Sequence, residues 1–387
     1  MGRKSGRAHC GRTIEIVMEA KKILIVSRSF YPENKPRAFR TTELAKELAM
    51  NGHQVTVITP RNDEVHNQFE KEHGIVIKDL GKATWQQIKV TGGGIKRLFK
   101  RIQARLFNLL FMYPDIQTMF LVKNALKKEK SKYDLLISIA APHPVHWGTA
   151  WANKTSNPIA TKWIADCGDP FMGGENDTFK RLFYFKYFEQ WFCRKADFIT
   201  VPIEDSITAY YPPYRSKIRV IPQGFRFEDV KLRDDIVANN IPTFAYAGTL
   251  IPKIRDPKEF FEFICELDID YRFVVYTNNP DHVSKYQQRS NGKIELRPFL
   301  PRLDLLAELQ QMDFVVNFEN IGPKQSPSKL IDYAIIKKPI LSVKTFGFES
   351  QPLLDFLKGN YQSQLQIPDP EQYRIQNVCN KFTALAN

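Results

Sequence analysis

Residues 22–59 read KILIVSRSFYPENKPRAFRTTELAKELAMNGHQVTVIT. The apolar run at 23–26 is typical of a strand that is buried on both faces of a parallel sheet. After a loop at 28–37, residues 38–50 repeat apolar side chains at helical spacing, and a second apolar run follows at 55–58. This β-α-β pattern predicts a right-handed crossover, and therefore the doubly wound sheet of an α/β fold.

The same alternation continues in two halves of similar size. Further strands are expected at 135–139, 161–165, 198–201, 243–247, 271–275 and 313–318. The sequence therefore predicts two Rossmann-like β/α/β domains that face each other across a cleft, where open α/β folds bind ligands. We divide the chain into an N-terminal domain at 21–226, a linker at 227–240 and a C-terminal domain at 241–365. The basic extension at 1–20 is expected to be disordered. The last segment, at 366–387, either stays with the C-terminal domain or crosses back to the N-terminal domain.

The composition limits the classes of function. With 387 residues, of which 43% are hydrophobic and 25% charged, the chain is long enough for two domains with full cores. No apolar run approaches the roughly 20 residues that span a bilayer. Five scattered cysteines without C-x-x-C spacing argue against a disulfide framework or a structural zinc site. We therefore expect a cytoplasmic protein. The net charge of +14 favours an anionic partner, whether nucleic acid, anionic lipid or a phosphorylated small molecule.

A candidate phosphate site follows the last of the expected strands. Ser326 or Ser328 can cap a helix that begins near Pro327. The unpaired N–H groups of its first turn, the helix dipole and Lys329 suit a phosphate or diphosphate. About one turn later, Asp332 can accept hydrogen bonds from a ribose. The alternative is an ordinary capped helix that packs on the sheet.

Several other short segments follow one another in a fixed order. They are FYPE at 30–33, ELAKEL at 43–48, GHQVTV at 52–57, APHPVH at 141–146, WIADCGDPF at 163–171, RKADFIT at 194–200, IPQGF at 221–225, AGTL at 247–250 and RDP at 255–257. With these segments and the helix after Pro327, residues 21–345 resemble the family 4 glycosyltransferases of the two-Rossmann-domain, or GT-B, type. The resemblance is to bacterial members that build capsule, exopolysaccharide or lipopolysaccharide.

The resemblance implies that a nucleotide-diphosphate sugar binds on the C-terminal domain. On this analogy Gly248 and Thr249 line the diphosphate, Asp332 binds the ribose, and Arg255 neutralises the charge of the leaving diphosphate. The remaining donor residues implied are Phe299 near the base and, near the phosphates, Lys324, Ser328, Lys329 and Leu330. Family members of this type retain the anomeric configuration by same-face attack and need no metal, so the resemblance implies no cofactor.

The acceptor is implied to bind on the N-terminal domain. Asp169 and His143 are the catalytic residues expected on that side of the cleft, and Asn34, Lys35 and Arg37 are expected to form a loop that contacts either the acceptor or the diphosphate. Asp169, at a strand end, can orient the acceptor hydroxyl or take its proton, or it can cap its own loop. His143 and His146 can contact a sugar or only pack. A metal pair is not expected, because no third ligand is apparent.

Three positions depart from the family pattern. Many members carry two glutamates eight positions apart, where this chain has Lys324 and Asp332. The glycine-rich loop near the N-terminus is replaced by residues 33–37, which place cations where backbone amides are common. Gly168 stands where relatives with an Asp-x-Arg-Asp-Pro-Trp segment have an arginine.

Residues 95–111 predict a basic amphipathic helix. Ile95, Leu98, Phe99, Ile102, Leu106 and Leu109 fall at helical spacing, and the flanks carry Lys96, Arg97, Lys100, Arg101 and Arg105. Such a helix can lie on an anionic membrane surface, where a lipid-linked acceptor would be met. The alternative is a core helix with one solvated face. The aromatic stretch at 183–192 is expected to belong to the domain core.

The leading hypothesis is a glycosyltransferase that moves a sugar from a nucleotide-diphosphate sugar to a saccharide or lipid-linked acceptor in surface-polysaccharide assembly. A sugar-nucleotide epimerase on the same fold is an alternative, although the chain shows few acid/base residues besides Asp169 and His143. A non-enzymatic anion-binding or nucleic-acid-binding protein is supported by charge alone. A nucleic-acid partner is not expected, because no helix-turn-helix, zinc-finger or RNA-binding signature is present. A transferase that has lost its activity is a further alternative.

Overall fold

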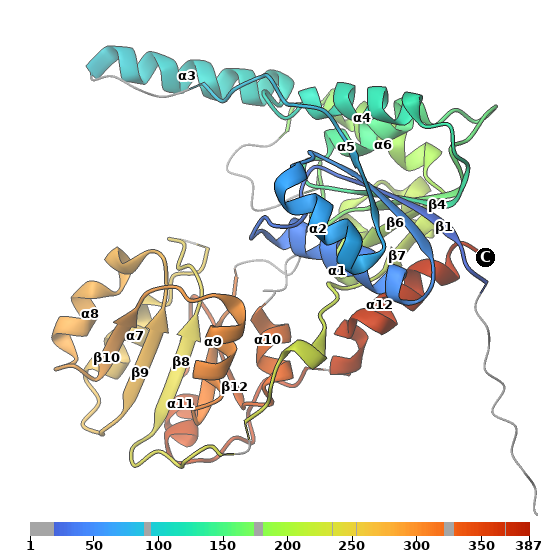
Figure 1. The fold of residues 1–387 in the computed structure, drawn as a ribbon. Coiled ribbons are helices and arrows are strands. Elements are labelled where there is room, and N and C mark those ends of the chain that lie inside the picture. The colour runs from blue at the N-terminus through green and yellow to red at the C-terminus, as the bar shows by residue number, and fades with distance from the viewer. Residues whose placement is uncertain are drawn as a thin grey trace, which may run out of the picture.

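The computed structural model describes residues 19–88, 94–173, 181–233, 235–252, 254–320, 329–367 and 369–387. Over these residues the chain forms two α/β domains, each built on a parallel sheet with helices on both faces (Figure 1). The predicted α/β class with two Rossmann-like domains is therefore confirmed. Lys324, Ser326, Pro327 and Ser328 lie outside the described residues, as does most of the expected extension at 1–20.

The sheet of the N-terminal domain has seven parallel strands among the described residues. In spatial order they are β3 (Val76–Asp79), β2 (Gln54–Thr59), β1 (Lys22–Ser27), β4 (Tyr133–Ile139), β5 (Ala160–Asp166), β6 (Phe198–Val201) and β7 (Ile218–Val220). Strand β1 explains the continuous apolar run near the N-terminus. Ile23 and Ile25 point into one core, whereas Leu24 and Val26 point into the core on the opposite face.

Helices cover both faces of this sheet. One face packs against α1 (Pro36–Met50) and α12 (Ile375–Ala384), and the other packs against α4 (Gln117–Lys128), α5 (Pro144–Ala152) and α6 (Phe185–Lys195). Helix α2 (Asp63–His73) leads into β3. Short 3-10 turns at Glu204–Ala209 and Pro212–Lys217 connect β6 to β7. Strand β5, next to the central strand β4, ends at Asp166, just before Gly168 and Asp169 of the wall that faces the second domain.

The sheet of the C-terminal domain has five parallel strands among the described residues. Their order is β10 (Ile294–Arg297), β9 (Arg272–Tyr276), β8 (Thr243–Ala247), β11 (Phe314–Phe318) and β12 (Ile340–Val343). Helices α7 (Lys258–Cys265), α8 (Ser284–Arg289) and α11 (Ser350–Leu357) cover one face, and α9 (Arg302–Leu309) and α10 (Lys329–Ile335) cover the other. Short 3-10 turns lie at Phe227–Asp229, Pro280–His282 and Pro370–Tyr373.

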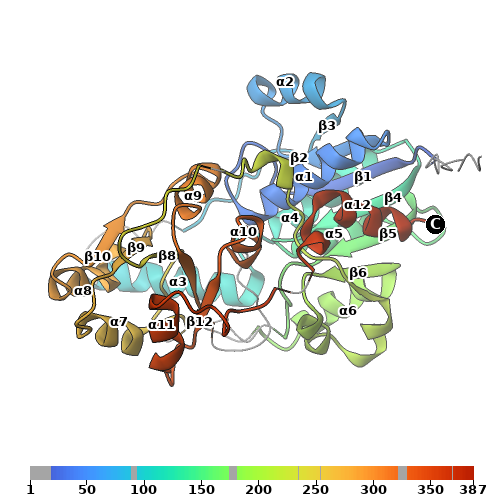
Figure 2. The same ribbon diagram turned by 90° about the horizontal axis from the view of Figure 1, so that it is seen from below.

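The chain crosses twice between the domains. The outgoing and returning segments pair at an isolated parallel bridge between Phe225 and Arg374. Beyond it, α12 packs on α1 through Val378 and Phe382, so the C-terminal end of the chain lies on the N-terminal domain (Figure 1). Arg226, at the crossing, is paired with Glu47 of α1 at 2.7 Å. These contacts bring α10 to the side of its domain that faces α1 (Figure 2).

Helix α3 (Gly94–Phe111) extends away from the body of the N-terminal domain (Figure 1). Most apolar side chains of its predicted stripe are exposed, such as Ile95 at 84%, Phe99 at 73% and Leu98 at 57%, whereas Leu109 is partly buried. The alternative of a core helix is therefore wrong. The aromatic stretch at 183–192 is mostly core, as expected, because Phe185 and Phe192 are buried in the cluster beneath α5.

Candidate active site

A cavity of about 720 Å³ lies between the two domains. Both domains contribute to its wall. The predicted residues that line it are Asn34, Arg37, Asp169, Arg255, Phe299, Leu330 and Asp332. Gly168, Gln223, Phe225, Arg302 and Asn320 line it as well, although the sequence analysis assigned them no role in the site. The cavity is thus the place where the two predicted halves of a site come together.

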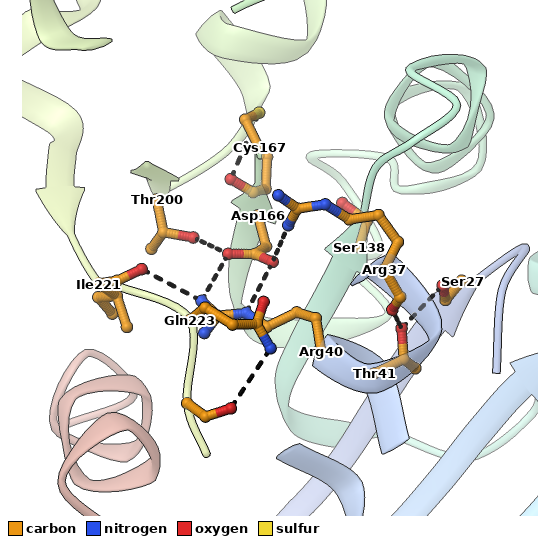
Figure 3. A network of polar contacts seen from close by, with 12 residues as sticks. Ser27, Arg37, Arg40, Thr41, Ser138, Asp166, Cys167, Thr200, Ile221 and Gln223 are labelled. Carbon is orange, nitrogen blue, oxygen red and sulfur yellow. Dashed lines mark hydrogen bonds and ion pairs between the residues drawn. The ribbon is translucent and has the colours of Figure 1, made fainter. Parts of the chain in front are cut away.

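A buried carboxylate fixes the N-terminal side of the cavity (Figure 3). Asp166, the last residue of β5, accepts hydrogen bonds from Nε and Nη2 of Arg40 at 3.1 and 2.9 Å and from Oγ1 of Thr200 at 2.7 Å. Burial alone would raise the pKa of Asp166, but the charge and hydrogen bonds of Arg40 hold that pKa below its ordinary value. Asp166 is therefore ionised and joins β5, β6 and α1.

Arg40 extends this network to the crossing between the domains. Its Nη2 donates to the carbonyl of Ile221 at 3.3 Å and its Nη1 to that of Pro222 at 2.5 Å. Its guanidinium also lies 5.0 Å from the ring centroid of Phe382 in α12. The network therefore holds the first turn of α1, and with it Arg37, against the inter-domain crossing. Neither Arg40 nor this pairing was predicted from the sequence.

Arg37 lies across the loop that follows β5. Its Nη1 is 3.7 Å from Asp166 Oδ2, and a Cβ placed on Gly168 would lie 1.6 Å from its Nη2. Only glycine at 168 leaves room for this side chain. Gly168 is the position where the family resemblance implies an arginine, and Arg37 supplies a guanidinium beside it from another element. Lys35 pairs instead with Glu33 at 3.1 Å and does not line the cavity.

Asp169 is exposed at the cavity wall. His143 lies behind its loop, with a hydrogen bond to the backbone of Asp169, and does not line the cavity. Burial, followed by the neighbouring His146, Arg181 and Arg37, lowers the pKa of His143 well below its usual range. The imidazole is therefore neutral, and it supports the loop of Asp169 rather than facing the cavity.

His146 belongs to the core. Its Nδ1 is 2.8 Å from Ser138 Oγ, and its Nε2 is 3.4 Å from Cys167 Sγ. Burial lowers the pKa of His146 to about 3. The interpretation of His146 as a sugar contact is therefore wrong, because its ring nitrogens are both engaged inside the domain.

Arg255 supplies a positive charge on the C-terminal side of the cavity. Its Nε donates to Asn320 Oδ1 at 2.9 Å and its Nη1 to the carbonyl of Thr249 at 3.0 Å. Gly248 and Thr249 follow β8, and neither lines the cavity itself. Gly248 has φ +151°, and a Cβ there would lie 3.0 Å from Tyr246 Oη. The turn after β8 thus positions Arg255 through its backbone.

Lys329, at the start of α10, turns inward beneath the Gly248 turn. Its Nζ lies 3.8 Å from the ring centroid of Tyr246 and 3.7 Å from the place of a Cβ on Gly248. Among the described residues it has no hydrogen-bond partner. Burial, and then the charge of Arg255, lowers the pKa of Lys329 well below its usual range. Lys329 is not among the residues that line the cavity, so the structure places its amine behind the wall that carries Arg255.

Asp332, one turn further along α10, is paired with Arg302. Arg302 Nε donates to Asp332 Oδ1 at 2.8 Å, and its Nη2 is 2.7 Å from the same oxygen. Burial raises the pKa of Asp332, and Arg302 opposes that rise. The guanidinium also stacks 4.5 Å from the ring centroid of Phe225 in the inter-domain crossing. The predicted ribose carboxylate therefore already has a cationic partner that the sequence analysis missed.

The remaining predicted donor residues divide into two groups. Phe299, which is 55% exposed, and Leu330 line the cavity and offer it apolar surface. Lys324 and Ser328 lie outside the described residues. Over the part of the chain that the structure describes, no group of three or more His, Cys, Asp or Glu side chains is arranged to hold a metal ion.

Glu189 of α6 holds the segment that follows Asp169. Its Oε1 accepts from the backbone N–H of Met172 at 3.3 Å, and burial raises its pKa from 4.5 to about 7. Because the folded chain binds this proton more tightly than the unfolded chain, Glu189 stabilises the fold at low pH. That stability, about 3 kcal/mol at 1.36 kcal/mol per pH unit, is lost as the pH rises from 4.5 to about 7.

A Glu189→Gln variant is therefore expected to gain stability relative to the native chain as the pH rises. Denaturant unfolding at about pH 4 and about pH 8 measures this, and the difference between variant and native chain should grow by about 3 kcal/mol. Glu204→Gln, at an exposed position of the same domain, is the matched control. An equal difference at both pH values would show that folding does not raise the pKa of Glu189.

Comparison with known proteins identifies the fold. Residues 39–228 match the family described as Glycosyltransferase Family 4. A glycosyltransferase from Rickettsia africae aligns with a TM-score of 0.56 and 12% identity over 96% of this chain and 95% of its own. HepE from Anabaena, solved with UDP and glucose, aligns with a TM-score of 0.52 and 13% identity over 95% of this chain and 97% of its own. The lipopolysaccharide outer core galactosyltransferase WaaB aligns with a TM-score of 0.54 and 10% identity over 94% of this chain and 98% of its own.

No curated protein sequence matches the chain. The two domains and the cavity between them have the arrangement of the GT-B fold. The family match over residues 39–228 supports a glycosyltransferase. The predicted family resemblance and the predicted enzyme class are therefore confirmed.

Proposed function

We propose that this glycosyltransferase transfers a sugar from a nucleotide-diphosphate sugar to a saccharide or lipid-linked acceptor. The observation that carries the proposal is the charge distribution of the inter-domain cavity. Arg37 lines it from the N-terminal domain, and Arg255 and Arg302 line it from the C-terminal domain. Fixed cations of this kind stabilise the charge that develops on a leaving diphosphate. HepE, which shares the fold, was solved with UDP and glucose.

The donor would bind mainly to the C-terminal domain. Arg255 and the buried amine of Lys329 would face the diphosphate. Asp332 would give up one of its hydrogen bonds from Arg302 and accept a hydrogen bond from a ribose hydroxyl instead. Phe299 would lie along the base. Asp169, on the opposite wall, would orient the acceptor hydroxyl.

The proposed reaction retains the anomeric configuration and uses no metal. The acceptor oxygen forms its bond to the anomeric carbon on the face from which the diphosphate departs, and the bond between that carbon and the diphosphate oxygen breaks. The acceptor proton passes to the departing phosphate oxygen. Arg255 stabilises the negative charge that accumulates on the diphosphate as the bond lengthens.

We further propose that the acceptor belongs to surface-polysaccharide assembly at the cytoplasmic face of the membrane. WaaB, whose name assigns it to the lipopolysaccharide outer core, has the same fold. Helix α3 supports a peripheral position, because it combines exposed apolar residues with basic ones. None of the helices in the described residues is both long and apolar enough to cross a bilayer.

Donor binding can be tested with the purified chain. A thermal-shift screen against UDP-, GDP-, dTDP- and ADP-sugars should yield one nucleotide class that raises the stability of the fold. At about 100 times its Kd, a ligand adds about 2.7 kcal/mol. Epimerisation of the bound sugar without an acceptor would contradict transfer, and the absence of a shift with every donor would contradict the proposed site. NMR of the product then tests retention.

An Asp332→Asn variant is expected to bind the nucleotide sugar about 10 to 100 times more weakly, because a hydrogen bond to a charged group contributes about 1.5–3 kcal/mol. Calorimetric titration with the donor identified by the screen measures the change. Asp304→Asn, at an exposed position of α9, is the matched control and should bind as the native chain does. If the Asp332 variant binds the nucleotide sugar as tightly as the native chain does, Asp332 does not bind the ribose.

A further inference from the structure

An apolar groove of about 590 Å³ lies on the N-terminal domain and shares no lining residue with the inter-domain cavity. It lies where the end of α3 meets the start of α4 and the start of α6. Among the side chains that line it are Trp85, Phe107, Phe111, Tyr113, Phe120 and Phe188. No charged side chain of the described residues lines it, so water has few partners there.

The rim of the groove is an ordered set of aromatic rings. Trp85 stacks on Tyr113 with ring centroids 5.7 Å apart, and the ring centroid of Phe120 lies 6.4 Å from that of Trp85. The backbone N–H of Trp85 donates to Gln117 Oε1 at 2.8 Å, which ties the main chain at Trp85 to α4. Trp85 is nevertheless 43% exposed. Tryptophan and tyrosine with one buried and one wet edge are typical of the boundary between hydrocarbon and water.

Helix α3 gives the surroundings of the groove a positive charge. Arg97, Lys100, Arg101 and Arg105 lie along the helix, and no Asp or Glu occurs anywhere from 81 to 114. Exposed apolar residues and basic residues on one projecting helix fit an anionic bilayer surface. The charge pattern thus favours an anionic lipid over a neutral apolar peptide as the occupant of the neighbouring groove.

The groove lies close to the acceptor side of the inter-domain cavity. Phe185 lines the groove, and its ring centroid is 5.8 Å from that of Phe171. Phe171 in turn packs on His143 at 4.8 Å and follows Asp169 by two positions in the chain. A lipid in the groove would therefore have only this layer of rings between its chain and the loop that carries Asp169.

We propose that the groove holds the hydrocarbon chain of an anionic lipid whose headgroup faces the cavity, while α3 lies on the bilayer surface. This is the form in which a lipid-linked acceptor would arrive, so the inference rests on the proposed function and specifies its acceptor class. In this arrangement α3 brings the enzyme to the bilayer, and the groove selects an acceptor that carries a chain.

Trp85 provides a direct readout of a chain in the groove. The full-length protein is mixed with vesicles of equal parts phosphatidylglycerol and phosphatidylcholine, with bromine at the middle of the phosphatidylglycerol chains. Bromine quenches tryptophan at short range, so fluorescence should fall relative to bromine-free vesicles. Both chains compared carry Trp151→Phe, because Trp151 is 40% exposed and its ring centroid lies 5.9 Å from that of Phe120 in the groove. In this background a Trp85→Phe variant should lose the difference, because Trp147 and Trp163 are fully buried and Trp191 packs against the core.

Two variants separate the groove from the helix. Phe107→Ser with Phe111→Ser, at positions that are both partly exposed, should abolish the quenching while the protein still sediments with the vesicles. Arg97→Glu with Lys100→Glu and Arg101→Glu should weaken sedimentation by at least about tenfold. Vesicle binding without quenching of Trp85, or quenching that survives in the groove variant, would overturn the proposal.

Failure of this inference is distinguishable from failure of the proposed function. The thermal shift with nucleotide sugars is measured without vesicles and depends on the inter-domain cavity alone. A donor shift without Trp85 quenching overturns the groove and leaves the transferase. Quenching without any donor shift leaves a lipid-binding protein and overturns the proposed reaction.

Discussion

Replacing Asp166 with alanine is expected to cost about 3–5 kcal/mol of unfolding free energy, because it leaves the buried guanidinium of Arg40 without its carboxylate. The side chains of both residues are only 3% exposed. Thr200 loses its acceptor as well, and the first turn of α1 loses its link to β5. Denaturant unfolding of the variant and the native chain at neutral pH measures the loss.

The matched control removes both charges together. Arg40→Met with Asp166→Leu should be less destabilising than Asp166→Ala, because no uncompensated charge stays buried. The pH dependence provides a second check. Since the folded-state pKa of Asp166 lies below its ordinary 3.8, its stabilisation is present above that pH and is lost as the pH falls through the folded-state pKa. A cost below about 1 kcal/mol for Asp166→Ala would contradict a stabilising role for the pair.

The fold was predictable because its strands carry a local signal. Strand β1 is apolar on both faces, and only the interior of a parallel sheet requires that pattern over consecutive residues. The loop after β5 was also predictable as a cavity wall, since Asp169 follows a strand end where α/β folds bind ligands. Both the strand and the loop are determined by residues that are adjacent in the chain, so the sequence alone was enough to predict them.

The pairings within the site were not predictable, because they join residues far apart in the chain. Arg302 and Asp332 are 30 positions apart, and Arg40 and Asp166 are 126 positions apart. No local pattern distinguishes Arg40 from the other basic residues of a strongly basic chain. The glycine at 168 was visible as a departure from the family, but only the structure shows that Arg37 occupies the space.

The status of α3 illustrates a different limit. Apolar residues at helical spacing describe a core helix and a membrane-surface helix equally well, since both present one apolar stripe. Exposure decides between them, and exposure is a tertiary property. The same limit applies to His146, whose sequence neighbourhood resembles that of His143 although its nitrogens bind Ser138 and Cys167 in the core.

The largest effect on catalysis is expected from Arg255→Ala, which should lower kcat by about 10²–10³ if the guanidinium stabilises the leaving diphosphate. The KM for the donor should change less than kcat, because the charge on the diphosphate increases only as the glycosidic bond breaks. Steady-state kinetics with the donor from the thermal-shift screen measures both constants. Arg255→Lys keeps a positive charge but not the fork of two donors, so it should recover part of kcat.

A purely structural role for Arg255 predicts a different pattern. Its Nε hydrogen bond to Asn320 and its Nη1 hydrogen bond to Thr249 could act by holding the turn after β8. Asn320→Ala removes the first of these bonds and leaves the cation in place, so it should change kcat far less than Arg255→Ala does. Equal losses in the two variants, or a loss of stability that matches the loss of kcat, would assign Arg255 to the turn. A large kcat loss in Arg255→Ala alone would identify its charge as the group that the transition state requires.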